Sequence, residues 1–150
     1  MMLSEFAPIT VQLIVADADA AITFYRNAFG AEEVVRNLAP DSGKVMHCEL
    51  FLLGTRLLLH EEFPGRSGPA ALGGTPVTLH LYVDNVDEVF ARAVAAGATV
   101  EMPLQEAFWG DRYGILLDPA GHRWSVATPN DDPAPSELHE RAEQWAAKER

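Results

Sequence analysis

The pattern of apolar and polar residues runs twice along the chain in the same order. Residues 15–34 and 83–100 each begin with a valine that ends a β-like run, pass through an acidic turn and a helical pattern, and end in Gly-Ala before another β-like run. Val15 and Asp19 in the first copy correspond to Val83 and Asp87 in the second. Self-similarity of this kind predicts two copies of one supersecondary unit.

Each copy contains one predicted amphipathic helix. Ile22, Tyr25 and Phe29 recur at helical spacing in the first copy and give it one apolar face. The matching residues of the second copy are Val86, Val89, Phe90, Ala93 and Val94. The candidate N-caps, short polar residues that accept helix N–H groups, are Asp17 or Asp19 and Asp84 or Asn85. Gly30 and Gly97 stand where a helix needs a left-handed residue at its C-terminal end.

The β-like runs complete the unit. We expect strands over residues 8–16, 33–38, 45–53 and 56–61 in the first copy, and over 76–83, 98–102, 113–117 and 123–128 in the second. Each copy is therefore β-α-β-β-β, and the fold class is α+β. Module one covers residues 8–62, a Gly/Pro-rich linker covers 63–75, and module two covers 76–129. Together they form a domain over residues 1–130.

Residues 131–150 are predicted to be a linker followed by a C-terminal helix. Ser136 is a candidate N-cap for this helix. Leu138, Ala142 and Trp145 fall at helical spacing and form a narrow apolar stripe. Two interpretations are open: the stripe packs on its own domain, or it contacts a second copy in a homodimer.

Composition narrows the possible partners. The 150 residues carry a net charge of −11, which disfavours binding to nucleic acid and to anionic membranes. No apolar run is long enough to span a bilayer, and the first eight residues have no basic cluster typical of a secretory signal. Cys48 is the single cysteine, so no internal disulfide forms, as in a reducing cytoplasm. Cys48 lies in an apolar stretch and is interpreted as a small packed residue.

Several motifs resemble the vicinal oxygen chelate superfamily, which includes glyoxalases, bleomycin-resistance proteins and extradiol dioxygenases. They are FYRNAFGA at 24–31, MHCEL at 46–50, GGTP at 73–76, VDNVD at 83–87, FWGDRYG at 108–114 and DPAGHRW at 118–124. The chain looks most similar to the PhnB-like branch, over residues 8–129. The resemblance implies that the modules form a cupped mixed β-sheet with a ligand or metal in the cup.

The resemblance also implies where a divalent metal would be held, by one residue from the first and one from the last strand of each module. Those positions fall on Thr10, Thr78 and Ser125, and near Leu58. These residue types do not form the usual site of nitrogen and oxygen ligands. The chain is therefore interpreted as a cytoplasmic small-molecule-binding protein that lacks a cofactor.

An alternative keeps one divalent metal ion in a shifted register. Alternation places Thr78, His80 and Tyr82 on one face of a strand, so His80, His60 and Glu49 are candidate ligands. The chain would then be an enzyme, a glyoxalase-like lyase or isomerase or a dioxygenase that polarises substrate oxygens through the metal. Catalytic residues are not assigned.

The predicted ligand-binding residues are those expected to line the cup. They are Gln12, His60, Thr78, His80, Tyr82, Trp109, Arg112 and Ser125. Trp109 is either a stacking wall for a flat ligand or a plug in the core. Arg112 is either a clamp for a carboxylate or phosphate, or a brace with Asp111 or with backbone. His122 is expected to bond backbone groups and Trp124 to lie in the core.

Overall fold

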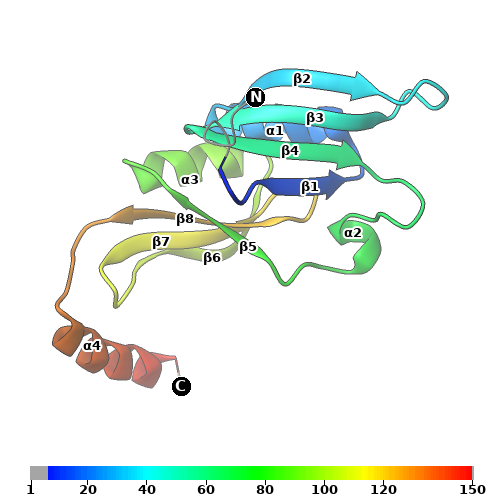
Figure 1. The fold of residues 1–150 in the computed structure, drawn as a ribbon. Coiled ribbons are helices and arrows are strands. Elements are labelled where there is room, and N and C mark those ends of the chain that lie inside the picture. Colours follow the sequence, from blue (N-terminus) through cyan, green and yellow to red (C-terminus); the bar gives the residue numbers. More distant parts are fainter. Residues whose placement is uncertain (1–6, 150) are drawn as a thin grey trace.

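The computed structural model describes residues 7–149, so residues 1–6 of the predicted first domain and Arg150 lie outside the described part. Module one consists of β1 (Val11–Val15), α1 (Ala18–Phe29), β2 (Glu32–Leu38), β3 (Val45–Leu52) and β4 (Thr55–Glu61). Module two consists of β5 (Thr78–Tyr82), α3 (Val86–Ala95), β6 (Thr99–Glu106), β7 (Asp111–Leu117) and β8 (Arg123–Pro129). The short α2 (Pro69–Leu72) connects the modules, and α4 (Pro135–Lys148) follows them (Figure 1).

Both modules have the same strand connectivity. The orders are β1-β4-β3-β2 and β5-β8-β7-β6, with the first and last strands of each module parallel and the other pairs antiparallel. The predicted α+β fold with two βαβββ modules and a C-terminal helix is confirmed. The strands form two four-stranded sheets and not one continuous sheet.

Local sequence explains the ends of α1 and α3, the long helices of the two modules. The side chains of Asp17 and Asn85 accept hydrogen bonds from the N–H groups of Ala20 and Glu88, as N-caps do. Gly30 ends α1 in the left-handed conformation with φ of 73°. Gly97 follows the α3 cap residue Ala96 with φ of 116°, so the second predicted glycine also has positive φ at the end of its helix.

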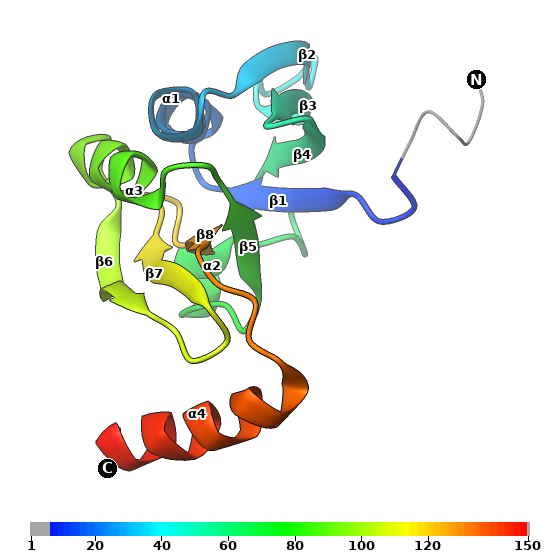
Figure 2. The same cartoon turned by 90° about the vertical axis from the view of Figure 1, so that its left-hand side faces the viewer.

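The two helices lie side by side in the angle between the two sheets (Figure 2). Their apolar faces and the facing sides of the sheets form one hydrophobic core. Removal of this apolar surface from water stabilises the fold. Trp124 lies in this core as predicted, with its ring 5.6 Å from Tyr25 and 5.0 Å from Phe29. The helix-free faces of the two sheets therefore point in different directions.

A buried carboxylate joins the modules. The Tyr25 hydroxyl of α1 donates a hydrogen bond to Asp118 Oδ2, and Trp124 Nε1 donates to the same oxygen at 2.9 Å. The backbone N–H groups of Ala120 and His122 donate to Asp118 Oδ1 at 2.9 and 3.0 Å. Burial and the neighbouring Asp118 hold the pKa of Tyr25 well above its usual value. The turn after β7 is thus tied to α1 of the other module.

His122 adds a second link between the modules. Its Nε2 lies 2.8 Å from the backbone oxygen of Ile14 at the end of β1. The expectation that His122 bonds backbone is confirmed, although the partner belongs to module one. Cys48 is fully buried in β3, as expected for a packed residue, and burial raises the pKa of its thiol to about 11.

The linker and tail depart from the predictions. Residues 69–72 form one helical turn that the Gly/Pro-rich pattern did not predict. The Ser136 cap was wrong, because α4 begins at Pro135 with Ala134 at the N-cap and without a side-chain cap. Pro is favoured at the first helical position, since its missing N–H is unpaired there anyway. None of the helices formed by the described residues is long and apolar enough to cross a membrane.

Replacing Tyr25 with Phe tests the link between the modules. The change removes one donor from a buried carboxylate, so we expect the free energy of unfolding to fall by about 2 kcal/mol. Urea unfolding measures it, with Tyr82→Phe as the control, because the Tyr82 side chain is exposed. A Tyr25→Phe protein as stable as its parent would show that the modules do not depend on this bond.

Candidate functional site

A cleft of about 380 Å³ opens between the β3–β4 turn and β5. It contains three of the predicted ligand-binding residues, Thr78, His80 and Tyr82. The other lining residues are Val11, Leu52, Leu53, Thr55, Arg56, Leu57, Leu79, Leu81 and Trp124. Apolar side chains predominate, with a few polar groups from β5 and from the start of β4, as is typical of small-molecule sites.

The polar side of the cleft is built by β5 and β8. Alternation along β5 places Thr78, His80 and Tyr82 on its exposed face, as predicted. His80 pairs with Ser125 across the parallel strands, and its Nδ1 lies 2.5 Å from the Ser125 hydroxyl. The His80 ring also contacts Tyr82 edge-on, with centroids 4.6 Å apart. The buried Ser125 thus orients His80 while the rest of the imidazole faces the cleft.

Arg56 is a cleft residue that the sequence analysis missed. Its Nε lies 3.1 Å from Oε1 of Glu49 on the neighbouring strand, and its side chain is partly exposed. Alternation from Leu58 and His60 places Arg56 on the helix-free face of β4. That alternation was the available signal, since a cation at the start of a strand is otherwise unremarkable. Arg56 brings positive charge to a cleft that is otherwise apolar and hydrogen-bonding.

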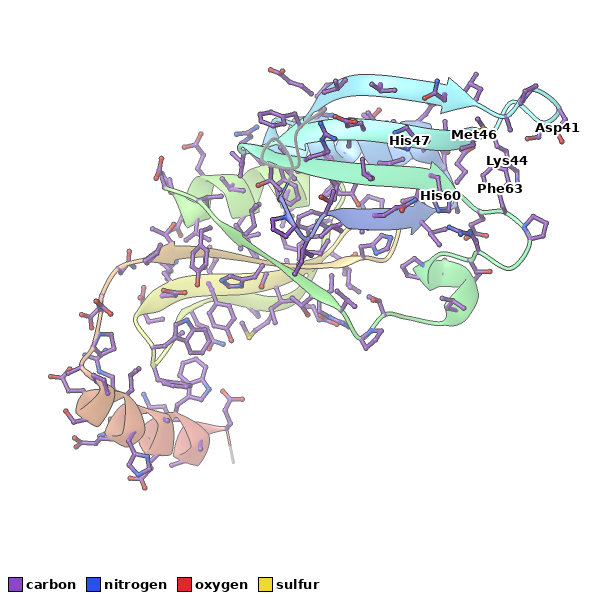
Figure 3. All side chains as sticks on the ribbon, viewed as in Figure 1. Asp41, Lys44, Met46, His47, His60 and Phe63 are labelled. Carbon is purple, nitrogen blue, oxygen red and sulfur yellow. The ribbon has the colours of Figure 1, made fainter. Side chains whose placement is uncertain are left out.

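Gln12 and His60 lie elsewhere, in an open hollow of about 310 Å³ at the other end of sheet one. Its other lining residues are Met46, Phe63, Pro64 and Arg66. Figure 3 shows His60 at the end of β4 with Met46 at the start of β3 and Phe63 beside them in the linker. His60 is only 4% exposed, and its Nδ1 lies 2.6 Å from the backbone oxygen of Glu61. The structure does not bring His60 and His80 into one site.

Trp109 belongs to a third location, an aromatic cluster under α4. Its ring centroid lies 4.8 Å from Tyr113, 5.0 Å from Phe108 and 6.5 Å from Trp145 of α4. Asp111 is buried beside this turn, and its Oδ2 has no hydrogen-bond partner in the part of the chain that the structure describes. Trp109 therefore packs against other aromatic rings, away from the cleft.

Arg112 points away from the other predicted residues. Its guanidinium binds Asp87 of α3 at 2.8 Å and Glu106 at 3.3 Å, and these contacts keep the pKa of Asp87 below its usual range. The side chain lies on the helix side of β7, because Gly114 and Leu116 of the same alternation set face Phe90 and the core. The arginine acts as a brace to α3 and not as a partner of Asp111.

A metal held in the family pattern would be bound by residues that pair between β1 and β4 and between β5 and β8. Gln12 pairs with Leu58 and His80 with Ser125, while Thr10 lies before β1. The first-strand positions are therefore Gln12 and His80, two residues beyond the predicted Thr10 and Thr78. Leu58 has no donor atom, so the set does not fit the four ligands of the family pattern.

The shifted metal site fits no better. Glu49 pairs with Arg56, and His60 and His80 line separate hollows. Within residues 7–149, no three His, Cys, Asp or Glu side chains are grouped closely enough to hold a metal ion.

Comparisons of the sequence and of the structure with known proteins point to one superfamily. The sequence model of the Glyoxalase/Bleomycin resistance protein/Dioxygenase superfamily matches residues 7–126. The uncharacterized protein Rv0887c of Mycobacterium tuberculosis is 48% identical over 122 residues, which cover 78% of this chain and 71% of that protein. The X-ray structure of the Arabidopsis thaliana At5g48480 product is 32% identical, with a TM-score of 0.66 over 81% of this chain and 98% of that one.

A PhnB protein from Bacillus cereus shares the fold. Its TM-score is 0.63, with 21% identity over 81% of this chain and 99% of that chain. The predicted resemblance to this superfamily is confirmed, and a PhnB-like protein is among its structural neighbours.

The metal content of the protein is the first quantity to measure. Because the paired positions offer Gln, Leu, His and Ser, we expect less than about 0.1 equivalent of any divalent metal to be retained. Elemental mass spectrometry on protein purified without a His tag measures it, before and after incubation with Zn, Mn, Fe, Co or Ni and desalting. Stoichiometric metal that His80→Ala abolishes would establish the shifted site instead.

Proposed function

Because the chain belongs to the Glyoxalase/Bleomycin resistance protein/Dioxygenase superfamily, we propose that it binds a small organic molecule in the cleft between the β3–β4 turn and β5. The observation that supports this most is the cleft itself, which joins apolar walls to an oriented imidazole. His80 is held by Ser125, so little conformational entropy is lost when it bonds a ligand.

The lining indicates the class of ligand. A volume of about 380 Å³ accommodates a molecule of up to three rings. Leu57, Leu81 and Trp124 would contact apolar or aromatic surface, while His80 would hydrogen-bond a polar group. Arg56, although paired with Glu49, is a neighbouring cation for an acidic substituent. We therefore propose an aromatic molecule with one anionic or hydrogen-bonding group.

Recognition in this proposal rests on hydrogen bonds and apolar contacts. A metal-dependent lyase, isomerase or dioxygenase would need donors that the paired positions lack, so no catalytic step is proposed. Of the residues predicted to bind ligand, we retain Thr78, His80 and Tyr82 for this cleft, and Ser125 as the residue that holds His80. A cytoplasmic location stays a prediction, supported by the free, buried Cys48.

We also propose that the protein is a homodimer in which α4 contacts the second copy. None of the fourteen residues of α4 is buried, and its ring contacts are those of Trp145 with Phe108 and Trp109. Arg141 adds an ion pair with Asp131 at 2.8 Å. An isolated helix of this length is marginal in water, so further packing is needed to stabilise it. A second copy is the simplest partner, since most soluble oligomers are homo-oligomers.

Substitution of His80 tests the binding proposal. Anilinonaphthalene sulfonate has the aromatic and anionic groups that the cleft fits, and its fluorescence reports binding. We expect saturable binding at one site per chain, weakened about tenfold in His80→Ala through the lost hydrogen bond to a charged group. His139→Ala, which changes an exposed histidine of α4, is the matched control. Equal affinities of the two variants would place the dye outside the cleft.

Removing α4 tests the assembly proposal. The parent chain is expected to have twice its monomer mass in light scattering, and a chain that lacks residues 134–150 is expected to be monomeric. Trp145→Ala should weaken the dimer as well, because it removes the contacts with Phe108 and Trp109 that hold α4 on its own chain. A truncated chain that stays dimeric would rule out this role of α4, and circular dichroism checks that both variants are folded.

A further inference from the structure

The turn between β3 and β4 holds a leucine in an unfavourable backbone conformation. Leu52 pairs with Thr55, so Leu53 and Gly54 form a two-residue hairpin loop, with φ of 46° and 78°. A loop with both central residues at positive φ is normally formed by Asn-Gly or Gly-Gly, since a side chain such as leucine clashes with its own backbone. Among residues 7–149, Leu53 is the one non-glycine residue with positive φ.

The side chain of Leu53 occupies a position between two hollows. It lines the cleft described above, and it also lines an open groove of about 490 Å³ along the start of α3. Tyr82 of β5 is the other residue that lines both hollows. The remaining groove residues are Val83, Asp84, Asn85, Glu88, Val89 and Arg92. Leu53 and Tyr82 thus stand where the cleft ends and the groove begins.

The exposure of Leu53 argues against a role in the core. The side chain is 55% exposed, so its burial stabilises the fold little, while its backbone conformation costs free energy. Strained residues of this kind persist where they serve a site. An asparagine would relieve the strain and satisfy the turn, but it would present a shorter, polar side chain to the cleft.

We propose that Leu53, together with Tyr82, closes one end of the ligand cleft and limits the length of the molecules that it admits. This inference rests on the proposed small-molecule binding in the same cleft. The two hollows differ in character, because the groove carries Asp84 and Glu88 whereas the cleft is mainly apolar. Closure by Leu53 separates an apolar ligand from these carboxylates, so the parent protein selects compact ligands.

The variant Leu53→Asn distinguishes a role of Leu53 in binding from a role in stability. We expect the substitution to stabilise the fold and to weaken ligand binding. Relief of the left-handed strain should raise the midpoint of thermal unfolding by about 2 to 4 °C. Opening the end of the cleft should weaken binding of anilinonaphthalene sulfonate about fivefold. The affinity of Nile red, a longer and uncharged aromatic dye, relative to that of anilinonaphthalene sulfonate, should rise about fivefold or more as the groove becomes accessible.

Leu72→Asn is the matched control, since it makes the same change at an exposed leucine of α2 outside both hollows. We expect it to leave the affinities of both dyes unchanged. If Leu53→Asn keeps the parent ratio of the two affinities, Leu53 is not an end wall and the inference fails while the binding proposal stands. If the parent chain shows no saturable binding of anilinonaphthalene sulfonate, the binding proposal fails, and the inference fails with it.

Discussion

The arrangement of the two modules depends on one buried charge. Asp118 accepts hydrogen bonds from the Tyr25 hydroxyl, the Trp124 indole and two backbone N–H groups of its own turn. A buried carboxylate is costly unless its oxygens are satisfied, and here the donors come from both modules. Separation of the modules would leave this charge without its donor from α1. A polar interaction inside an apolar core therefore ties the turn after β7 to α1, in addition to the apolar packing of α1 on α3.

The candidate site depends on the same region. Trp124 donates to Asp118, packs against Phe29 of module one and also forms part of the cleft wall. The next residue of β8, Ser125, orients His80. Two consecutive residues thus connect the core to the cleft, one from each face of the strand, because alternation directs them to opposite sides. A change in how the modules pack would alter the shape of the cleft, whereas the alternation of side chains along β5 would stay the same.

Features that depend on local periodicity could be predicted from the sequence. The repeat, the helix of each module, the outward face of His80 and the buried Trp124 all follow from spacing within one element. Contacts between distant residues could not be predicted in this way. Arg112 forms its ion pair with Asp87 on α3 and not with its neighbour Asp111. The faces that carry His60 and His80 point in different directions, because the helices pack between the sheets.

The tie between Tyr25 and Asp118 also has a consequence for synthesis of the chain. The two residues are 93 positions apart, and the first module is complete in sequence at Glu61. A ribosome delivers module one long before Asp118 and Trp124, so Tyr25 and Phe29 on α1 have no cover during that interval. Apolar surface exposed in this way promotes aggregation and attracts chaperones. We therefore expect the nascent first module to expose this apolar surface to chaperones while about half of the chain is translated, although the same surface is buried in the finished protein.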